Sequence, residues 1–225
     1  YISISGKADS SHKFTTASLF SGGLSSVIAA IKSGFKLIWG ADYQLKHRRM
    51  WTRLTNTRCF KDVFGKRVAT STPPNYLKCS APSDDYTRKG SKRGASGETR
   101  WMLLRQTSLI IRLAPEAFLL STSDNISNIN SGAELEAVRQ KLSKHYVLYE
   151  KVLRSWQYGD PSNRKQLYMV GISLSLGQPA FDFQFPKAKY DATLWPRAEL
   201  IAEPDDDVPT DCWIEGDILL AHQSG

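Results

Sequence analysis

The feature that most constrains the fold is a repeated alternation between short apolar segments and segments with helical periodicity. Residues 15–20 and 35–42 are short and apolar, and the segment between them spaces its apolar residues as a helix does before Gly34. These patterns predict a strand, a helix and a second strand. Because the alternation continues to residue 174, the sequence predicts an α/β fold with a mainly parallel sheet and helices on both faces.

The later segments follow the same rule. Pro115 ends a long apolar-periodic segment, because proline disfavours helix in the residue before it. Further helices are predicted at residues 43–54, 98–115 and 131–145, and further strands at 58–63, 75–80, 116–121, 146–153 and 166–174.

Three domain segments are predicted from changes in composition. Residues 1–13 are polar and form an irregular lead-in, and residues 14–176 form the folded domain. Residues 177–225 lose periodicity and contain five prolines and an acidic run at 205–207, which predicts an extended C-terminal tail.

Charge and cysteine content narrow the function classes. The net charge of +8 favours an anionic partner such as nucleic acid. Three cysteines make no disulfide framework, and neither they nor the four histidines have the spacing of a metal site. No apolar run approaches the roughly 18 residues that a membrane-spanning helix needs. The few cysteines favour a reducing, intracellular compartment. The chain begins at Tyr1 and not with methionine, so the nucleus and an organelle reached after removal of a leader both stay open.

The first strand–helix unit, "SLFSGGLSSVIAAIKSGF", has the features of a cofactor site. Gly22 and Gly23 allow a ligand to approach the backbone, and the following helix begins with free amide groups. Asp42, at the end of the next strand, is placed to bind ribose hydroxyls. An ordinary tight turn explains the same glycines, because GxGxxG is not matched.

The order of several short motifs is more specific. "LFSG", then "GF" with a tryptophan and an acid, then "KDV", a proline-led loop and "NRKQLYMVG" follow one another in the chain. In this order they resemble the DNA cytosine-5 methyltransferase family over residues 15–186. Within that family they are most similar to the methyltransferase-like domains of some eukaryotic retroelements. The resemblance implies the Rossmann-like fold of S-adenosylmethionine-dependent methyltransferases. No target-recognition region or final pocket-closing helix of the family is recognisable.

Much of the cofactor half of that family is matched. The resemblance implies that Phe20 and Gly22 lie under S-adenosylmethionine, that Asp42 binds its ribose and that Tyr43 packs on its adenine. It also implies that Asp62 bonds the adenine amino group and that Pro82 precedes the nucleophile. The predicted cofactor-binding residues are therefore Phe20, Gly22, Gly23, Asp42, Tyr43, Asp62 and Pro82. Two positions depart from the family, with Ser18 for an acid and Leu24 for a glycine, so the sequence leaves open whether S-adenosylmethionine binding is kept or lost.

The catalytic half departs further. The family extrudes its target base and adds a cysteine thiolate to cytosine carbon 6, with help from a glutamate and an arginine. Here the cysteine position is Ser83 and the glutamate position is Ser121. In "SNRKQ" the first arginine is kept as Arg164, and the second position is Gln166. A shifted register would place Asn75 at the nucleophile position, but it crowds "KDV" against the loop.

Two basic clusters complete the pattern. Residues 83–98 read as a long loop, which in the family closes over DNA, and its basic side chains would contact phosphates. The predicted nucleic-acid-binding residues are Arg88, Lys89, Lys92, Arg93 and Arg100. For the second cluster, residues 46–49, a solvated helix face is the simpler interpretation.

These observations predict a catalytically degenerate cytosine-5 methyltransferase-like domain. It would serve as a binding or structural component, with nucleic acid or a larger protein/RNA assembly as its partner. One alternative is an active S-adenosylmethionine-dependent DNA or RNA methyltransferase with an unconventional site that uses Ser83. Another is a purely structural subunit in which both pockets are empty.

Overall fold

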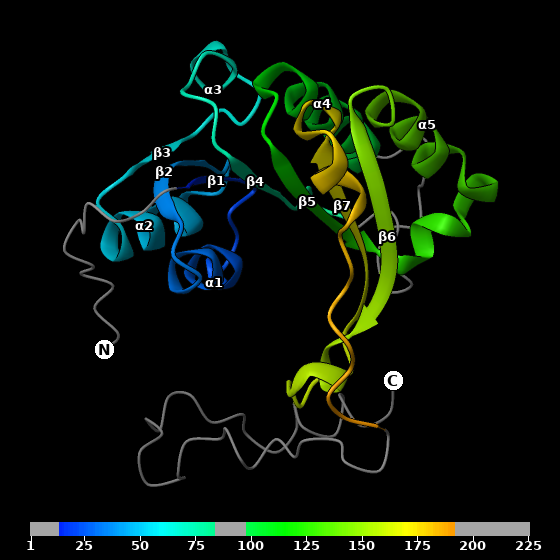
Figure 1. The fold of residues 1–225 in the computed structure, drawn as a ribbon. Coiled ribbons are helices and arrows are strands. Elements are labelled where there is room, and N and C mark those ends of the chain that lie inside the picture. Colours follow the sequence, from blue (N-terminus) through cyan, green and yellow to red (C-terminus); the bar gives the residue numbers. More distant parts are fainter. Residues whose placement is uncertain (1–13, 84–97, 192–225) are drawn as a thin grey trace, which may run out of the picture. The chain divides into compact units, whose positions relative to one another are not determined.

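Residues 14–83 and 98–191 are described by a computed structural model of the chain, with no account of the side chains of 98–100. Their core is one seven-stranded sheet (Figure 1). Its strands are β1 (Thr15–Leu19), β2 (Lys36–Ala41), β3 (Arg58–Phe60), β4 (Tyr76–Cys79), β5 (Ala117–Ser123), β6 (Tyr146–Arg154) and β7 (Lys165–Ser173). No helix among the described residues is long and apolar enough to cross a membrane.

The strand order is β3-β2-β1-β4-β5-β7-β6. The strands from β3 to β5 pair in parallel, and β7 runs antiparallel to β5. The predicted mixed, mainly parallel sheet is confirmed. Because parallel neighbours end at the same edge, the loops after β1, β2, β3 and β4 lie together there.

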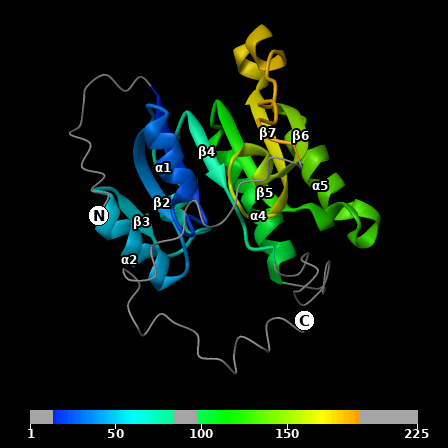
Figure 2. The same cartoon turned by 90° about the horizontal axis from the view of Figure 1, so that it is seen from below.

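Helices cover both faces of the sheet. They are α1 (Ser25–Lys32), α2 (Leu45–Leu54), α3 (Lys66–Ala69), α4 (Glu98–Leu113) and α5 (Ala133–Leu142). One apolar cluster joins α1 and α2 to β2 through Val27, Leu37 and Trp51, and a larger cluster joins α4 and α5 to the central strands. Figure 2 shows α1 and α2 beside the β1–β3 part, and α4 and α5 beside the β5–β7 part.

The third predicted strand is shorter than expected. The sequence predicts residues 58–63, whereas β3 ends at Phe60. Asp62 accounts for the difference, because its Oδ1 accepts a hydrogen bond from the backbone N–H of Phe64 at 3.1 Å. This local bond turns the chain away from the sheet, as aspartate often does.

The described chain divides into two compact units. Residues 14–83, 98–153 and 165–186 belong to the first, and residues 154–164 and 187–191 belong to the second. Part of the predicted tail lies in the first unit, where Tyr149 Oη donates to the carbonyl of Ala180 and its ring lies 5.1 Å from that of Phe183. The predicted segment boundaries at residues 14 and 176 stay predictions.

Candidate functional site

The loop after β1 has an unusual backbone. Phe20, Gly22 and Leu24 all have positive φ angles, of 55°, 53° and 65°. Glycine adopts this conformation freely, whereas each non-glycine residue is strained by roughly 1–2 kcal/mol. Leu24 holds the left-handed position at the start of α1 and is only 1% exposed. Burial of its side chain offsets the strain, so the loop is held in shape by the core beneath it.

Asp42, at the end of β2, fixes the same loop. Its carboxylate accepts hydrogen bonds from the backbone N–H groups of Gly22 (3.0 Å) and Gln44 (2.8 Å), and Oδ2 lies 3.0 Å from Nδ1 of His47. The residue is 2% exposed. Three internal contacts on a buried carboxylate make Asp42 a structural tie between β1, β2 and α2.

Aromatic rings border the loop. The ring of Phe20 lies 6.4 Å from that of Tyr43 and 5.6 Å from that of Phe64, both edge to face. Tyr43 is 45% exposed, and the guanidinium of Arg105 on α4 lies 4.5 Å from the centroid of the Phe64 ring. The arrangement leaves the ring of Tyr43 open beside the carboxyl ends of β1 and β2, over the buried ring of Phe20.

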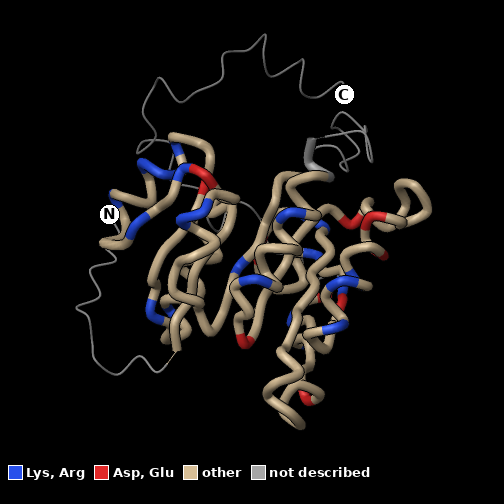
Figure 3. The backbone as a smooth tube through the Cα atoms, turned by 90° about the horizontal axis from the view of Figure 1, so that it is seen from above, with Lys and Arg blue, Asp and Glu red and all other residues tan. Residues whose placement is uncertain are grey.

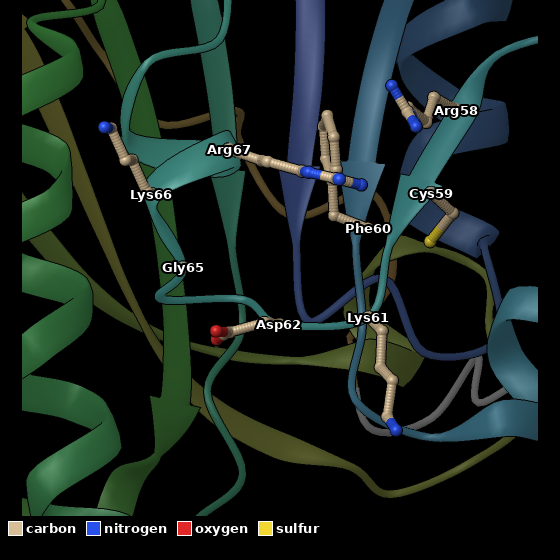
Figure 4. Close-up of a pocket in the computed structure, with 8 residues that line it drawn as sticks. All are labelled: Arg58, Cys59, Phe60, Lys61, Asp62, Gly65, Lys66 and Arg67. Carbon is tan, nitrogen blue, oxygen red and sulfur yellow. The ribbon is translucent and has the colours of Figure 1, made fainter.

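Asp62 is exposed and lies beyond the end of β3. It borders a depression of about 460 Å³ that is lined by Arg58, Cys59, Phe60, Lys61, Asp62, Gly65, Lys66 and Arg67 (Figure 4). Its Oδ1 faces the N–H of Phe64, and a side chain at Gly65 would meet its Oδ2. Asp62 therefore has a turn-forming role and an exposed carboxylate at once.

Pro82 and Ser83 follow β4 at the same edge of the sheet and are partly buried. The backbone N–H of Ala81 donates to Oε1 of Gln106, which reaches across from α4 at 3.1 Å. Gln106 is 0% exposed, and its Nε2 has no hydrogen-bond partner among the described residues. α4 thus holds the start of the loop that carries Ser83.

A compact polar cluster lies between β4 and β5. Lys78 Nζ donates to Oγ of Ser80, and Oγ of Ser80 shares a hydrogen bond with Oγ of Ser121. Lys78 is 9% exposed. A buried lysine side chain and two hydroxyls therefore stand where the sequence resemblance places a glutamate.

The positions around β7 are separated between the two units. Gln166 belongs to the first unit, where it lies on β7 opposite Ser123 of β5. Its Oε1 accepts a hydrogen bond from Tyr168 Oη at 3.2 Å. Arg164 is exposed and belongs to the second unit, where its backbone N–H donates to Ser155 Oγ at 3.0 Å.

The fold excludes two other residues from the site, Asn75 of the shifted register and Asp124, the acid that follows Ser121 by three residues. Asn75 precedes β4 at the opposite end of that strand from Ser83, and its Oδ1 accepts hydrogen bonds from Thr15 at 2.8 Å. Asp124 lies just beyond β5, in a short 3-10 helix, and is ion-paired with Lys165 at 2.8 Å. Neither residue can replace Ser83 or Ser121 at the site.

A comparison with protein families identifies the family to which this fold belongs. The model of the C-5 cytosine-specific DNA methylases matches residues 14–223. The chain belongs to this family. Its seven-stranded sheet and the loops at the carboxyl ends of β1 to β4 are thus those of an S-adenosylmethionine-dependent methyltransferase fold.

Individual methylases agree with this assignment. The type II methyltransferase M.HaeII of Haemophilus aegyptius is 25% identical over 215 residues, which cover 92% of this chain and 63% of the relative. M.HpaII of Haemophilus parainfluenzae is 25% identical over 183 residues, which cover 79% and 51%. The chain therefore spans between half and two thirds of the length of these relatives.

Solved structures of methyltransferases show the same fold. A DNMT2 mutant of Spodoptera frugiperda matches with a TM-score of 0.65 at 16% identity, over 93% of this chain and 65% of the other. The EhMeth methyltransferase of Entamoeba histolytica matches with a TM-score of 0.59 at 11% identity, over 79% and 57%.

The methylase cofactor can be tested against the residues present. Buried Oγ atoms of Ser18 and Ser21 have no hydrogen-bond partner among the described residues, which is typical of a site completed by water or ligand. The Phe20–Tyr43 surface and exposed Asp62 also fit an adenine. The buried, engaged carboxylate of Asp42 does not fit the ribose contact expected from its position.

No methylase nucleophile replaces Ser83 among the described thiols. Burial, and then the neighbouring Asp42 carboxylate, raise the pKa of Cys59 to about 12. Cys79 is fully buried, and burial raises the pKa of its thiol as well. Both remain protonated near neutral pH and lack the thiolate that the methylase reaction needs.

Several predicted positions lie outside the described residues. They are Arg88, Lys89, Lys92 and Arg93, and for Arg100 only the helical backbone is described. Sequence reasoning missed the cluster of Lys78, Ser80 and Ser121. A lysine inside an otherwise apolar strand, "YLKC", was the available signal. Among the described residues no group of metal-ligating side chains occurs.

Proposed function

We propose that this chain is a methylase-family domain that binds nucleic acid without transferring a methyl group. The observation that carries the proposal is the cluster of Lys78, Ser80 and Ser121, which stands at the family's glutamate position beside Ser83 at its cysteine position. Residues 14–176 contain the whole sheet, and the family match continues beyond them to residue 223.

The chemistry of the reaction argues against catalysis here. Carbon 5 of cytosine becomes nucleophilic only after a thiolate has added to carbon 6, and a serine hydroxyl supplies no comparable anion near neutral pH. An ammonium group donates hydrogen bonds but cannot accept them. Lys78, while protonated, therefore does not offer the acceptor oxygens that a carboxylate presents to the base.

Cofactor binding is proposed to be weak rather than absent. The aromatic surface of Phe20 and Tyr43 and the exposed carboxylate of Asp62 support recognition of an adenine. The engaged carboxylate of Asp42 leaves no acceptor open for the ribose, since the residue is 2% exposed. S-adenosylmethionine would then be held mainly through its base.

The test is a methyl-transfer assay with labelled S-adenosylmethionine on duplex DNA and on RNA. We expect no transfer above a protein-free blank, and the same result for the Ser83→Ala variant. Calorimetric titration of S-adenosylmethionine should show weak binding that Asp62→Ala weakens further. Methyl transfer by the unaltered chain would contradict the proposal.

One observation favours a second candidate, an active methyltransferase with an unconventional site. The Lys78 amine lies against two hydroxyls, and lysine serves as a base for serine in some enzymes. If this candidate is correct, the chain transfers methyl groups and Ser83→Ala or Ser121→Ala abolishes the transfer.

A further inference from the structure

A run of exposed basic residues occupies the edge of the sheet at β3. Between residues 43 and 75 the chain carries eight lysines and arginines and a single acid, Asp62. β3 is the terminal strand on this side of the sheet, and α2 packs against it. In Figure 3 the side of the molecule that carries α2 and β3 is rich in blue segments and poor in red.

The basic side chains of α2 point in two directions. His47 faces inward to Asp42, and Arg48 donates to the backbone carbonyls of Asp42 and Tyr43 at 3.1 and 2.6 Å. Lys46, Arg49 and Arg53 are exposed and recur three and four residues apart. This spacing places the three cations on one face of the helix. The simple solvated-face interpretation therefore applies to only part of the cluster.

The exposed cations border two depressions. A depression of about 630 Å³ on α2 is lined by Leu45, Lys46, Arg49, Met50, Arg53 and Leu54. The depression of Figure 4, about 460 Å³, contains four basic residues of β3 and α3 around Asp62. We call the lysine and arginine side chains that line these two depressions the basic edge. Three residues of chain lie between the end of α2 at Leu54 and Arg58, so the two depressions follow one another along the chain.

The charge of the basic edge is not neutralised within the part of the chain that the structure describes. Its lysines and arginines form no ion pair there, whereas Arg139 on α5 pairs with Glu136 and Glu150. The one acid in the run, Asp62, directs Oδ1 to a backbone N–H. Such a surface concentrates positive potential and attracts an extended anion.

We propose that the basic edge binds the phosphate backbone of nucleic acid. The proposal rests on the proposed function only in that the partner is a nucleic acid. Arginine suits phosphate because its planar guanidinium group can donate hydrogen bonds to two phosphate oxygens at once. The basic edge contains three such residues in Arg49, Arg53 and Arg58. The span from Lys46 to Arg53 is about 10 Å along the helix, the rise of about three base pairs. A phosphate strand can therefore meet several of these cations together.

This surface is separate from the base-handling positions. Three strand spacings, roughly 15 Å, separate β3 from β4, which carries Ser83 at its end. The basic edge would thus hold nucleic acid away from Ser83 without reading its sequence, and only its α2 depression is clear of Asp62, the proposed adenine contact. Charged residues also protect an edge strand from pairing with other chains, and that role alone predicts no affinity for phosphate.

The experiment compares two variants of equal charge in the full chain. Lys46→Ala with Lys66→Ala removes one exposed lysine from each depression. Lys141→Ala with Lys144→Ala removes two exposed lysines on and after α5. Binding of a 20-base-pair DNA duplex of mixed sequence is measured by fluorescence anisotropy between about 0.05 and 0.3 M salt. Circular dichroism checks that both variants fold.

We expect the first variant to bind the duplex more weakly than the unaltered chain at 0.1 M salt. Each of its two lost lysine–phosphate contacts should weaken binding about five- to tenfold. The slope of log K against log salt should flatten by about two, because each phosphate contact contributes about 0.9. The second variant should match the unaltered chain. Arg49→Ala with Arg53→Ala should weaken binding at least as much as the first variant and offers a second route if the first misfolds.

Three results would overturn the proposal. Equal losses in both lysine variants would mean that only net charge matters, and no loss in either would mean that the edge makes no contact. Displacement of the duplex by vesicles of anionic lipid or by polyglutamate at equal charge would assign the surface to another class of partner. The methyl-transfer assay decides the proposed function independently, since its result does not alter the comparison of the lysine variants.

Discussion

The two halves of the sheet differ in what their polar residues do. In the cofactor half, residues 15–69, Asp42 binds the β1 loop and α2 through contacts to Gly22, Gln44 and His47. In the base half, residues 76–83, 117–153 and 165–173, Ser121 and Gln166 each share a hydrogen bond with one side-chain hydroxyl, that of Ser80 and that of Tyr168. The Asp42 carboxylate joins three elements of the fold, whereas each of these side chains joins one hydroxyl. We therefore expect substitution of Asp42 to cost more stability than substitution of Ser121 or Gln166.

The largest effect is expected where this structural role is removed. Asp42→Ala leaves the buried N–H of Gly22 and the His47 ring without their acceptor, and we expect a loss of about 3 kcal/mol in the free energy of unfolding. Denaturant titration measures it. Asp62→Ala is the control, because that exposed carboxylate accepts one backbone bond and should lose about 0.5–1 kcal/mol.

The same two substitutions distinguish an effect on protein stability from an effect on S-adenosylmethionine binding. Asp62→Ala should weaken S-adenosylmethionine binding in a chain that stays folded. If Asp42→Ala unfolds no more easily than Asp62→Ala, then Asp42 is not a structural tie, and the contrast between the halves fails at its first point.

Packing provides a second comparison, because each half has a glycine under an aromatic ring. A Cβ at Gly40 would collide with the ring of Trp51, and a Cβ at Gly171 would collide with the ring of Phe118. Both rings are fully buried. Gly40→Ala and Gly171→Ala should each lower the free energy of unfolding by about 1–3 kcal/mol, since a well-packed core yields little.

Gly23→Ala is the control for both substitutions. A Cβ at Gly23 has no neighbour within 4 Å, so thermal unfolding should change by less than about 0.5 kcal/mol. A small effect at Gly171 beside a large one at Gly40 would mean that the base half is less tightly packed than the cofactor half.

The sequence predicted the fold better than the site, for physical reasons. Strand–helix alternation depends on local spacing, and the predicted elements from residue 15 to residue 174 lie where the structure has them, apart from the short β3 and the four-residue α3. The contact between Ser80 and Ser121 joins residues 41 apart, and only the pairing of β4 with β5 brings them together. The role of Asp42 was hidden for the same reason, since its partner Gly22 lies 20 residues earlier.

The smallest expected effect concerns how each half ends a helix. In the cofactor half, Gly34 follows α1 with a φ of 88°, and in the base half Ala114 follows α4 with a φ of 45°. The left-handed conformation suits glycine and strains alanine by roughly 1 kcal/mol.

Gly34→Ala should therefore lower the free energy of unfolding by about 1 kcal/mol. Ala114→Gly, at an exposed position, should raise the free energy of unfolding by somewhat less, because glycine also makes the unfolded chain more flexible. Thermal unfolding of the two single variants and of the double variant measures both shifts, which should add because the sites share no contact. Opposite signs would mean that the base half keeps a strained helix end that a single substitution relieves. A loss of stability in Ala114→Gly would mean instead that the alanine methyl group packs usefully there, and that the two halves end their helices equally well.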